Sequence, residues 1–174
     1  MRLNFTDKEF KFIEMLAYGR HFLKDIVNPD RDLQTWANTQ SQADLLGVMG
    51  EYAVSKYLKT PFDTTINLNG DGGEIDMFLG ENSIQVKSTK YSTGRLVFNK
   101  KEEIKADINI FVYCNIENKF ARILGYIKKD NILDVLYEKN LGHGIRFCVD
   151  QDNLHPISEL MEINREFESN FLQD

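Results

Sequence analysis

The chain has few of the residues that would cross-link or interrupt it. It contains two cysteines, Cys114 and Cys148, which lie in apolar runs far apart among 174 residues. Because no CxxC or HxxxH spacing occurs, a zinc site is not expected. The thiols are expected to be reduced and buried, as suits the cytoplasm. With three prolines, no repeat and no linker, the sequence predicts one domain of 1–174, with a helical extension (1–40) and a core (41–174).

Long apolar runs are also missing. The sequence has no stretch of about 18 apolar residues, so it predicts no membrane-spanning helix. Its N-terminal sequence, MRLNFTDKEFKF, lacks the apolar centre of a secretory signal. No GxxxxGK[ST] motif is present, which excludes a nucleotide-driven motor of that type.

Positive charge is scarce overall but concentrated in one place. The formal net charge of −6 argues against a simple electrostatic nucleic-acid binder. Between Asn82 and Lys101, however, there are five basic residues and no acidic one. Such a basic island is typical of a surface where a polyanion docks, and a solvated loop would explain it equally well.

The first part of the chain predicts two helices. A Thr-x-x-Glu capping box begins the first helix at Thr6, and Asn28-Pro29 ends it. The side chains expected on its buried face are Phe12, Leu16, Gly19, Leu23 and Ile26. The polar stretch 30–42 is expected to be a loop with a short helical turn, anchored by Trp36. A second helix is expected over 41–58, with Leu46, Met49, Ala53 and Tyr57 buried.

The remainder predicts strands mixed with short helices. Strands are expected at 64–68, 75–79, 83–89, 95–98, 108–115, 121–127 and 145–149. Helices are expected at 101–106, 130–139 and 157–171. This order predicts an α/β or α+β domain with a central mixed β-sheet flanked by helices.

The segments 75–79 and 83–89 carry the polar residues that are candidates for catalysis or metal binding. Gln85 and Lys87 are two apart, so both side chains point to one face of their strand. A two-residue turn at Gly80-Glu81 or Glu81-Asn82 would pair Asp76 with Gln85 or Lys87 and bring it to that face. A three-residue turn would pair Asp76 with Val86 instead.

These residue types suit a metal-dependent reaction on phosphate. The Asp76 carboxylate suits Mg²⁺, a hard cation that takes oxygen ligands. The Gln85 side-chain oxygen and the Val86 backbone carbonyl are further, neutral donors. Lys87 could orient or deprotonate an attacking water, or stabilise charge that develops on phosphorus. A metal would also bridge carboxylate and phosphate, which answers the objection raised by the acidic net charge.

Glu51 lies in the second predicted helix between apolar groups and two glycines. Each helical glycine costs roughly 1 kcal/mol relative to alanine, so Gly47 and Gly50 predict close approach of the backbone to the sheet or to a ligand. The simpler alternative is plain helix–sheet packing, with Glu51 reaching water.

Three motifs in this order resemble the PD-(D/E)XK nuclease superfamily, which has a restriction-endonuclease-like fold. They are GxxGE (Gly47 to Glu51), Gly73-Glu74-Ile75-Asp76 and Gln85-Val86-Lys87-Ser88-Thr89, and they span about 41–90. The resemblance implies one metal site formed by Glu51, Asp76, Gln85 and Lys87. It also implies Mg²⁺ as cofactor, with Mn²⁺ able to substitute, DNA as substrate, and a homodimer as one arrangement.

The sequence departs from the usual motif at Gln85, where Asp or Glu is common. A neutral ligand lowers the negative charge of the site and weakens metal binding. One alternative is therefore a non-catalytic module that binds DNA or a partner protein. Another is a structural domain in which Lys87 and Asp76 form a buried ion pair.

The DNA-facing surface is predicted to include Lys90, Tyr91, Arg95, Lys100 and Lys101. Each of these could instead be a solvated side chain. Glu74 is a weaker candidate for a second acid, and Ser88 and Thr89 for phosphate contacts. A nuclease of a phage or mobile element and a repair enzyme would look alike at this level.

Overall fold

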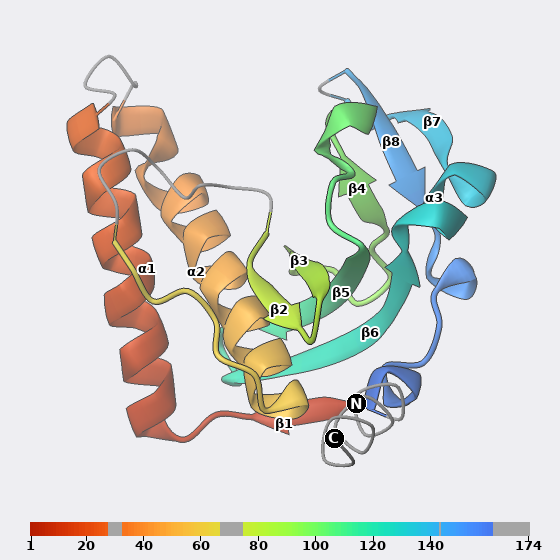
Figure 1. The fold of residues 1–174 in the computed structure, drawn as a ribbon. Coiled ribbons are helices and arrows are strands. Elements are labelled where there is room, and N and C mark those ends of the chain that lie inside the picture. Colours follow the sequence, from red (N-terminus) through yellow and green to blue (C-terminus); the bar gives the residue numbers. More distant parts are fainter. Residues whose placement is uncertain (28–32, 67–74, 143, 162–174) are drawn as a thin grey trace, which may run out of the picture.

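The computed structural model describes residues 1–27, 33–66, 75–142 and 144–161. Helices and two β-sheets make up the fold (Figure 1). The helices are α1 (Asp7–Val27), α2 (Leu33–Leu58) and α3 (Lys129–Val135), with 3₁₀ turns η1 (Lys101–Glu103) and η2 (Gln151–Asn153). The strands are β1 (Arg2–Asn4), β2 (Met77–Leu79), β3 (Asn82–Thr89), β4 (Leu96–Phe98), β5 (Ile108–Asn115), β6 (Phe120–Lys128), β7 (Tyr137–Asn140) and β8 (Ile145–Val149).

The larger sheet is mixed. Its strand order is β1-β6-β5-β3-β2, in which β3 and β5 are parallel and the other neighbours are antiparallel. The smaller sheet has the order β4-β8-β7 and is antiparallel. Figure 1 shows α1 and α2 on one side of the larger sheet, with the smaller sheet and α3 on the other. The predicted mixed sheet flanked by helices is confirmed.

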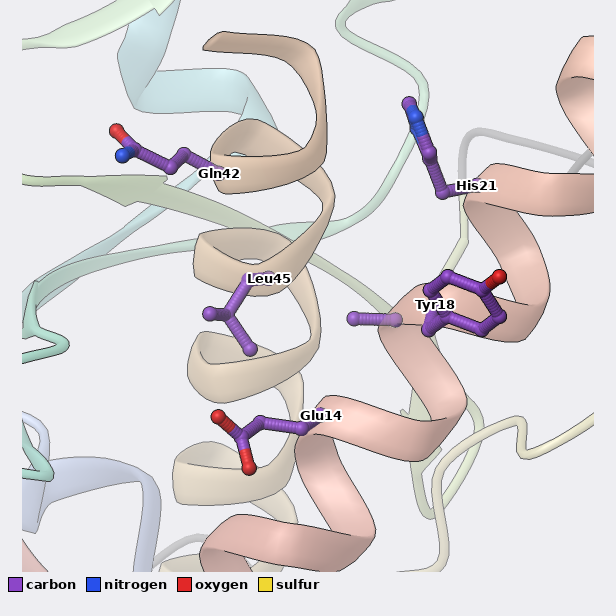
Figure 2. Close-up of a pocket in the computed structure, with 6 residues that line it drawn as sticks. Glu14, Tyr18, His21, Gln42 and Leu45 are labelled. Carbon is purple, nitrogen blue, oxygen red and sulfur yellow. The ribbon is translucent and has the colours of Figure 1, made fainter. Parts of the chain in front are cut away.

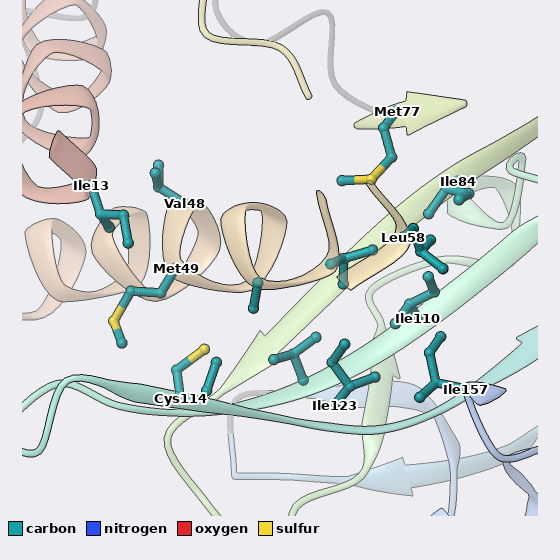
Figure 3. Close-up of a cluster of buried hydrophobic side chains, with 14 of the residues drawn as sticks. Ile13, Val48, Met49, Leu58, Met77, Ile84, Ile110, Cys114, Ile123 and Ile157 are labelled. Atoms are coloured by element: carbon teal, nitrogen blue, oxygen red, sulfur yellow. The ribbon is translucent and has the colours of Figure 1, made fainter. Parts of the chain in front are cut away.

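Two apolar clusters cover the two faces of the larger sheet. On the helix side, Ile13 and Met49 belong to the same buried cluster as Ile84 and Ile110 (Figure 3). On the other side, Phe111 packs with a group from the smaller sheet and α3 that includes Leu96, Phe98, Ile132 and Val149. Successive side chains of a strand point to opposite faces, which is why Ile110 and Phe111 of β5 join different clusters.

Helix α1 begins as predicted, but of its predicted apolar stripe Leu16 is buried while Phe12 and Ile26 are exposed. Its capping box is present: the Thr6 N–H donates to Glu9 Oε2 (2.8 Å), and the Glu9 N–H donates to Thr6 Oγ1 (3.3 Å). The buried side chains include Ile13, Leu16 and Ala17, whereas Phe12 and Ile26 are 43% and 53% exposed. Apolar residues occur at helical spacing on two overlapping stripes of α1, so the spacing alone could not decide which stripe faces the sheet.

Helix α2 begins earlier than predicted. It starts at Leu33, within the stretch expected to be a polar loop. No glycine or proline lies between Leu33 and Leu46, so this stretch contains no residue that breaks a helix. The boundary predicted at residue 40 therefore falls inside α2. The Trp36 side chain lies outside the described residues.

Several short elements of the structure differ from those predicted from the sequence. The strands β1 and β7 were missed, and the helix expected over 130–139 ends at Val135 before β7 begins. The helix expected over 101–106 is the 3₁₀ turn η1. Residues 64–66 form no strand, and 158–161 are the described part of the last predicted helix. The predicted turn at 69–73, Glu74 and His143 lie outside the described residues.

The β2–β3 hairpin has the two-residue turn that the sequence allowed. Leu79 pairs with Asn82 across Gly80-Glu81, and Met77 pairs with Ile84. Gly80 has a φ of 59°, a left-handed conformation that glycine adopts without steric strain. Strand β2 begins at Met77, so Asp76 stands immediately before it rather than inside it.

Candidate functional site

Asp76 lies beside the middle of β3. Its N–H donates to the Ile84 carbonyl oxygen (2.8 Å), and its Oδ2 accepts a hydrogen bond from the Val86 N–H (2.6 Å). These two bonds place Asp76 alongside Gln85. In a paired strand, one residue directs its N–H and its carbonyl to the same neighbour. The Val86 carbonyl is therefore directed to the edge of β3 where Asp76 stands.

Gln85 and Lys87 share a face of β3, as the alternation predicted. Ile84 and Val86 belong to the cluster on the helix side. Lys87 points the other way, because its ammonium lies 5.6 Å from the ring centre of Phe98 in β4. The two predicted site residues of β3 therefore face the smaller sheet.

Two buried amide oxygens lie on this face without a donor. Gln85 is 5% exposed, and its Oε1 has no hydrogen-bond partner among the described residues. Asn109 of β5 is in register with Gln85 and is fully buried. Its Nδ2 donates to the Ala106 carbonyl (3.3 Å), while its Oδ1 has no donor in the described part of the chain. A buried acceptor without a partner costs about 1–3 kcal/mol, so these oxygens indicate a place for an ion, a water or a ligand atom.

Lys87 faces an acid that the sequence did not single out. Its Nζ lies 3.9 Å from Glu103 Oε2, and the two side chains are 29% and 27% exposed. The alternative in which Lys87 and Asp76 form a buried ion pair is therefore wrong. Asp76 instead accepts its hydrogen bond from the backbone of β3.

Glu51 is held between α1 and α2. Arg20 Nη1 lies 2.9 Å from Glu51 Oε2 and 3.2 Å from Oε1, and the two side chains are 8% and 12% exposed. Arg20 also donates to the Asp63 carbonyl oxygen. The alternative in which Glu51 reaches water is therefore wrong. The Arg20 guanidinium offsets its charge.

The two glycines beside Glu51 have different surroundings. A Cβ built on Gly50 would collide with Ser88 Oγ of β3, so this glycine allows the close approach of α2 to the sheet that was predicted. At Gly47 the nearest atom to such a Cβ would be Glu51 Oε1, at 4.0 Å. The prediction of close packing against the sheet is confirmed for Gly50. Gly47 has no such close neighbour in the sheet among the described residues, and its predicted approach to a ligand stays a prediction.

A cleft of about 490 Å³ lies on the Lys87 face of β3. Its lining includes Lys87, Thr89, Tyr91 and Arg95 together with the apolar side chain of Phe111. Tyr91 and Arg95, which were predicted to face DNA, therefore line the same cleft as Lys87. Ser88 and Thr89, predicted as weaker phosphate contacts, also line it.

Acids offset part of the positive charge of this cleft. Arg95 Nε lies 3.0 Å from Asp150 Oδ1, and Tyr137 also donates to that oxygen. The hydrogen bond from Arg95 lowers the pKa of Asp150, so the pair is ionised at neutral pH. Arg95 could bind a phosphate only in competition with Asp150.

The other predicted DNA contacts lie apart from the cleft lining. Lys90 lines a second hollow with Gln42 and Asn115, and its Nζ is 5.6 Å from the ring centre of Tyr91. Lys100 is exposed, and Lys101 lies 5.2 Å from the ring centre of Phe147. These three lysines therefore lie outside the cleft lining, although the sequence predicted one DNA-facing surface that includes them.

A further hollow, of about 170 Å³, lies over α1 and α2 and is lined by Glu14, Tyr18, His21, Gln42 and Leu45 (Figure 2). His21 Nδ1 is 2.8 Å from Asp44 Oδ2. This hollow lies on the helix side of the larger sheet, opposite to the cleft.

The donor set for a metal is incomplete in this arrangement. Within residues 1–27, 33–66, 75–142 and 144–161, no three His, Cys, Asp or Glu side chains gather closely enough to hold an ion. The predicted set contains only two carboxylates, Glu51 and Asp76, and draws its other donors from Gln85 and Val86. Gln85 Oε1, which is buried and has no partner among the described residues, fits that set, whereas Glu51 is engaged by Arg20.

The predicted burial of the two cysteines is confirmed. Cys114 and Cys148 are free and buried, and burial raises the pKa of Cys114 to about 12. A thiol with that pKa is a poor nucleophile at neutral pH. No described helix is long and apolar enough to cross a membrane.

Three residues at the site were missed by sequence reasoning. Asn109 had a signal, because it is a polar residue inside the apolar run 108–114. Arg20 had a weaker one, since it follows Ile13 and Leu16 at helical spacing. Glu103 had none, because nothing in the sequence distinguishes it from the neighbouring Glu102.

Comparison with protein-family models, with curated proteins and with solved structures gives no significant match. The functional argument therefore rests on the residues of this chain.

Proposed function

We propose that the protein is a Mg²⁺-dependent deoxyribonuclease of the PD-(D/E)XK type, with Asp76, Gln85 and Lys87 at its centre. One observation supports this most strongly. Asp76 stands alongside Gln85, whose buried oxygen has no donor among the described residues, and Lys87 leads from the same strand face into a cleft.

Asp76, Gln85 and the Val86 carbonyl are the groups proposed to hold the ion. Glu51 of α2, which lies on the helix side of the larger sheet and pairs with Arg20, is proposed as a further ligand. When bound, Mg²⁺ would supply Lewis-acid stabilisation of the phosphate and a more acidic water. Asp76 contributes the negative charge, and Gln85 contributes a neutral oxygen. Because Arg20 offsets the charge of Glu51, Glu51 contributes less to metal affinity than Asp76 does.

Hydrolysis adds one water across a phosphodiester bond. The water oxygen bonds to phosphorus, the bond from phosphorus to one sugar oxygen breaks, and that oxygen takes up a proton. Lys87 is placed to orient the water or to stabilise the added negative charge on phosphorus. Thr89 and Tyr91 line the same cleft and are placed to contact the DNA backbone.

The test is cleavage of DNA in the presence of Mg²⁺ or Mn²⁺. We expect Asp76→Ala and Lys87→Met to lower the cleavage rate by about 100-fold or more, the range typical of removing a proton-transfer group. Asp130→Asn and Lys128→Met are matched controls, because both residues are exposed and lie away from the cleft lining. A wild-type protein inactive on duplex, branched and single-stranded DNA would refute the proposal.

A non-catalytic DNA- or protein-binding module is the second candidate. The neutral Gln85 and the pairing of Arg95 with Asp150 favour it, because both weaken a phosphate-cleaving site. A calorimetric titration separates the two candidates. Binding of Mn²⁺ that is lost in Asp76→Ala supports the nuclease, and absence of Mg²⁺ and Mn²⁺ binding supports the module.

A further inference from the structure

Helix α1 has an apolar face that is exposed to solvent. Large apolar side chains that are between 43% and 71% exposed make up this outer face of α1: Phe12, Met15, Tyr18, Phe22 and Ile26. Each other helix or strand in the described ranges has at most one exposed side chain of this kind. Figure 1 shows α1 as the outermost helix, with α2 between it and the larger sheet. A contiguous exposed apolar patch is typical of a contact surface.

The outer face of α1 is continuous along the helix. Positions 12, 15, 19, 22 and 26 alternate steps of three and four residues, the spacing of a seam between two packed helices. Gly19 is the small residue of this seam, and a Cβ there would collide with Cδ1 of Ile66, which is itself 45% exposed. Ile66 therefore fills the gap. The rings of Tyr18 and Phe22 lie stacked, with their centres 6.3 Å apart, so the apolar surface has no break.

The area of the outer face fits the contact of two copies. A large side chain has an accessible area on the order of 200 Å², so five that are about half exposed offer roughly 500 Å². A standard interface buries about 800 Å² per partner, and homodimer interfaces are about 65% apolar. A dimer therefore needs about 500 Å² of apolar surface from each copy, and the outer face of α1 alone supplies it.

Exposed charge on the same helix favours a second copy in an antiparallel orientation. Lys8 and Lys11 are exposed in the first two turns of α1, near the end of the helix dipole that disfavours cations. In an antiparallel pair they lie beside the C-terminal end of the partner's helix, where the dipole favours cations. A two-fold contact also uses the same patch twice, so it needs no second complementary surface.

We infer that the outer face of α1 is the contact surface of a symmetric dimer of this chain, in which two α1 helices pack antiparallel. The half of the seam that contains Phe12 then meets the half that contains Ile26 in the partner. The cleft lined by Lys87 lies on the opposite side of the larger sheet, so each copy keeps its cleft turned away from the contact. The dimer does not depend on the proposed function, because it uses none of the residues of the proposed metal site.

Sedimentation equilibrium of the full chain tests the dimer. Interfaces of standard size have a Kd of about 1 µM or tighter, so at about 50 µM protein we expect twice the chain mass of 20.2 kDa. Met15→Glu and Phe22→Glu should each weaken the dimer by about 10-fold or more, because each places a charge in the centre of the contact.

The chain offers matched controls on other elements. Leu133 of α3 is 66% exposed, against 65% for Met15, and Phe78 of β2 is 56% exposed, against 52% for Phe22. Leu133→Glu and Phe78→Glu should change the Kd of the dimer by less than about twofold, as is usual for substitutions at exposed positions. Thermal unfolding of all four variants checks that each is folded.

Disulfide cross-linking tests the antiparallel arrangement. Cys114 and Cys148 are buried, so a cysteine introduced on the outside of α1 is the accessible thiol. Positions 11 and 18 are one heptad apart and flank the seam on the same side. A disulfide needs Cα atoms within about 7 Å. Position 18 lies close to the two-fold axis, whereas the two copies of position 11 stand about 20 Å apart along the helices. We therefore expect Tyr18→Cys, and not Lys11→Cys, to form a disulfide-linked dimer under mild oxidation.

Three results would overturn the inference. The first is a wild-type chain that stays monomeric at the stated concentration. The second is a dimer that Leu133→Glu or Phe78→Glu weakens as much as Met15→Glu does, because the contact would then lie elsewhere. The third is cross-linking of Lys11→Cys in place of Tyr18→Cys, which would indicate parallel helices. Each of these results leaves the proposed function as it stands.

Discussion

At the scale of single residues, the ion pair of Arg20 and Glu51 has two opposed effects. It joins α1 to α2 with both side chains largely withdrawn from water, at 8% and 12% exposure. It also occupies a carboxylate that the proposed function needs for the metal. The first effect belongs to stability and the second to activity, so substitution of Arg20 should act on both.

We predict that Arg20→Met destabilises the fold by about 3–5 kcal/mol, because it leaves the buried Glu51 charge without its guanidinium. Lys87→Met is the comparison. Lys87 is 29% exposed and 3.9 Å from its acid, so its loss should cost less than about 1 kcal/mol, as for exposed pairs. Urea unfolding at pH 7 measures both values.

Adding Glu51→Gln to Arg20→Met should recover part of the lost stability, since it removes the buried charge. Equal stability of Arg20→Met and the wild type would contradict the role assigned to the pair. A Lys87→Met variant destabilised by several kcal/mol would revive a structural role for Lys87.

The relative placement of Asp76, Gln85 and Lys87 could be predicted from the sequence because strand alternation is local. Gln85 and Lys87 lie two apart, and the hairpin turn then places Asp76 beside them. Arg20 and Glu103 could not be predicted in the same way. Their contacts depend on how α1 packs on α2 and on how η1 lies relative to β3, and local sequence periodicity carries no information on either arrangement.

At the scale of elements, the packing of α2 on β3 sets how far Glu51 lies from the sheet. Gly50 faces Ser88, and a side chain there would collide with the hydroxyl oxygen. Gly47 lies about one turn earlier, and a Cβ there would meet only Glu51 Oε1, at an ordinary contact distance of 4.0 Å, among the described residues. Alanine substitutions at these two positions therefore compare the cost of close packing at Gly50 with the gain in helix propensity at Gly47.

We predict opposite effects of alanine at these two positions. Gly47→Ala should stabilise the protein by up to about 1 kcal/mol, the intrinsic difference between glycine and alanine in a helix. Gly50→Ala should destabilise it by about 1–3 kcal/mol, as expected for overpacking. The free energies of unfolding in urea measure both changes.

Adding Ser88→Ala should rescue Gly50→Ala, because it removes the colliding oxygen. That hydroxyl has no hydrogen-bond partner among the described residues, so its removal is not expected to cost much by itself. Stabilisation by Gly50→Ala alone would show that α2 can move away from β3.

Strongly patterned elements could be predicted and weakly patterned ones could not. The apolar runs of β5 and β6 and the capping box of α1 carry clear signals. Strand β7 has the sequence YEKN, which is short and polar and is a strand because it pairs with β8. The first turns of α2 are likewise polar, and their helical state depends on an absence of helix breakers rather than on an apolar stripe.

At the scale of the whole molecule, the two sides of the larger sheet carry different kinds of residues. The long helices cover one side with an apolar core, while the other side holds Gln85, Lys87, Asn109 and the cleft. The protein has a formal net charge of −6. Acidic residues also lie beside two cations of this cleft, because Glu103 faces Lys87 and Asp150 faces Arg95. A protein with this charge distribution should bind DNA through a metal more than through its own cations.

We therefore predict weak DNA binding without metal and a shallow dependence on salt. Each phosphate neutralised by a lysine or arginine contributes about −0.9 to the slope of log K against log salt for duplex DNA. Lys87 and Arg95 already face acids, so the slope in EDTA should lie between about −1 and −3. Adding Ca²⁺, which takes oxygen ligands as Mg²⁺ does, should raise the affinity by about 10-fold or more. Fluorescence anisotropy over a series of KCl concentrations measures both quantities, with a gel to check that the DNA stays intact. Tight binding in EDTA with a slope steeper than about −6 would contradict this account and indicate a binding module that holds DNA through its basic residues alone.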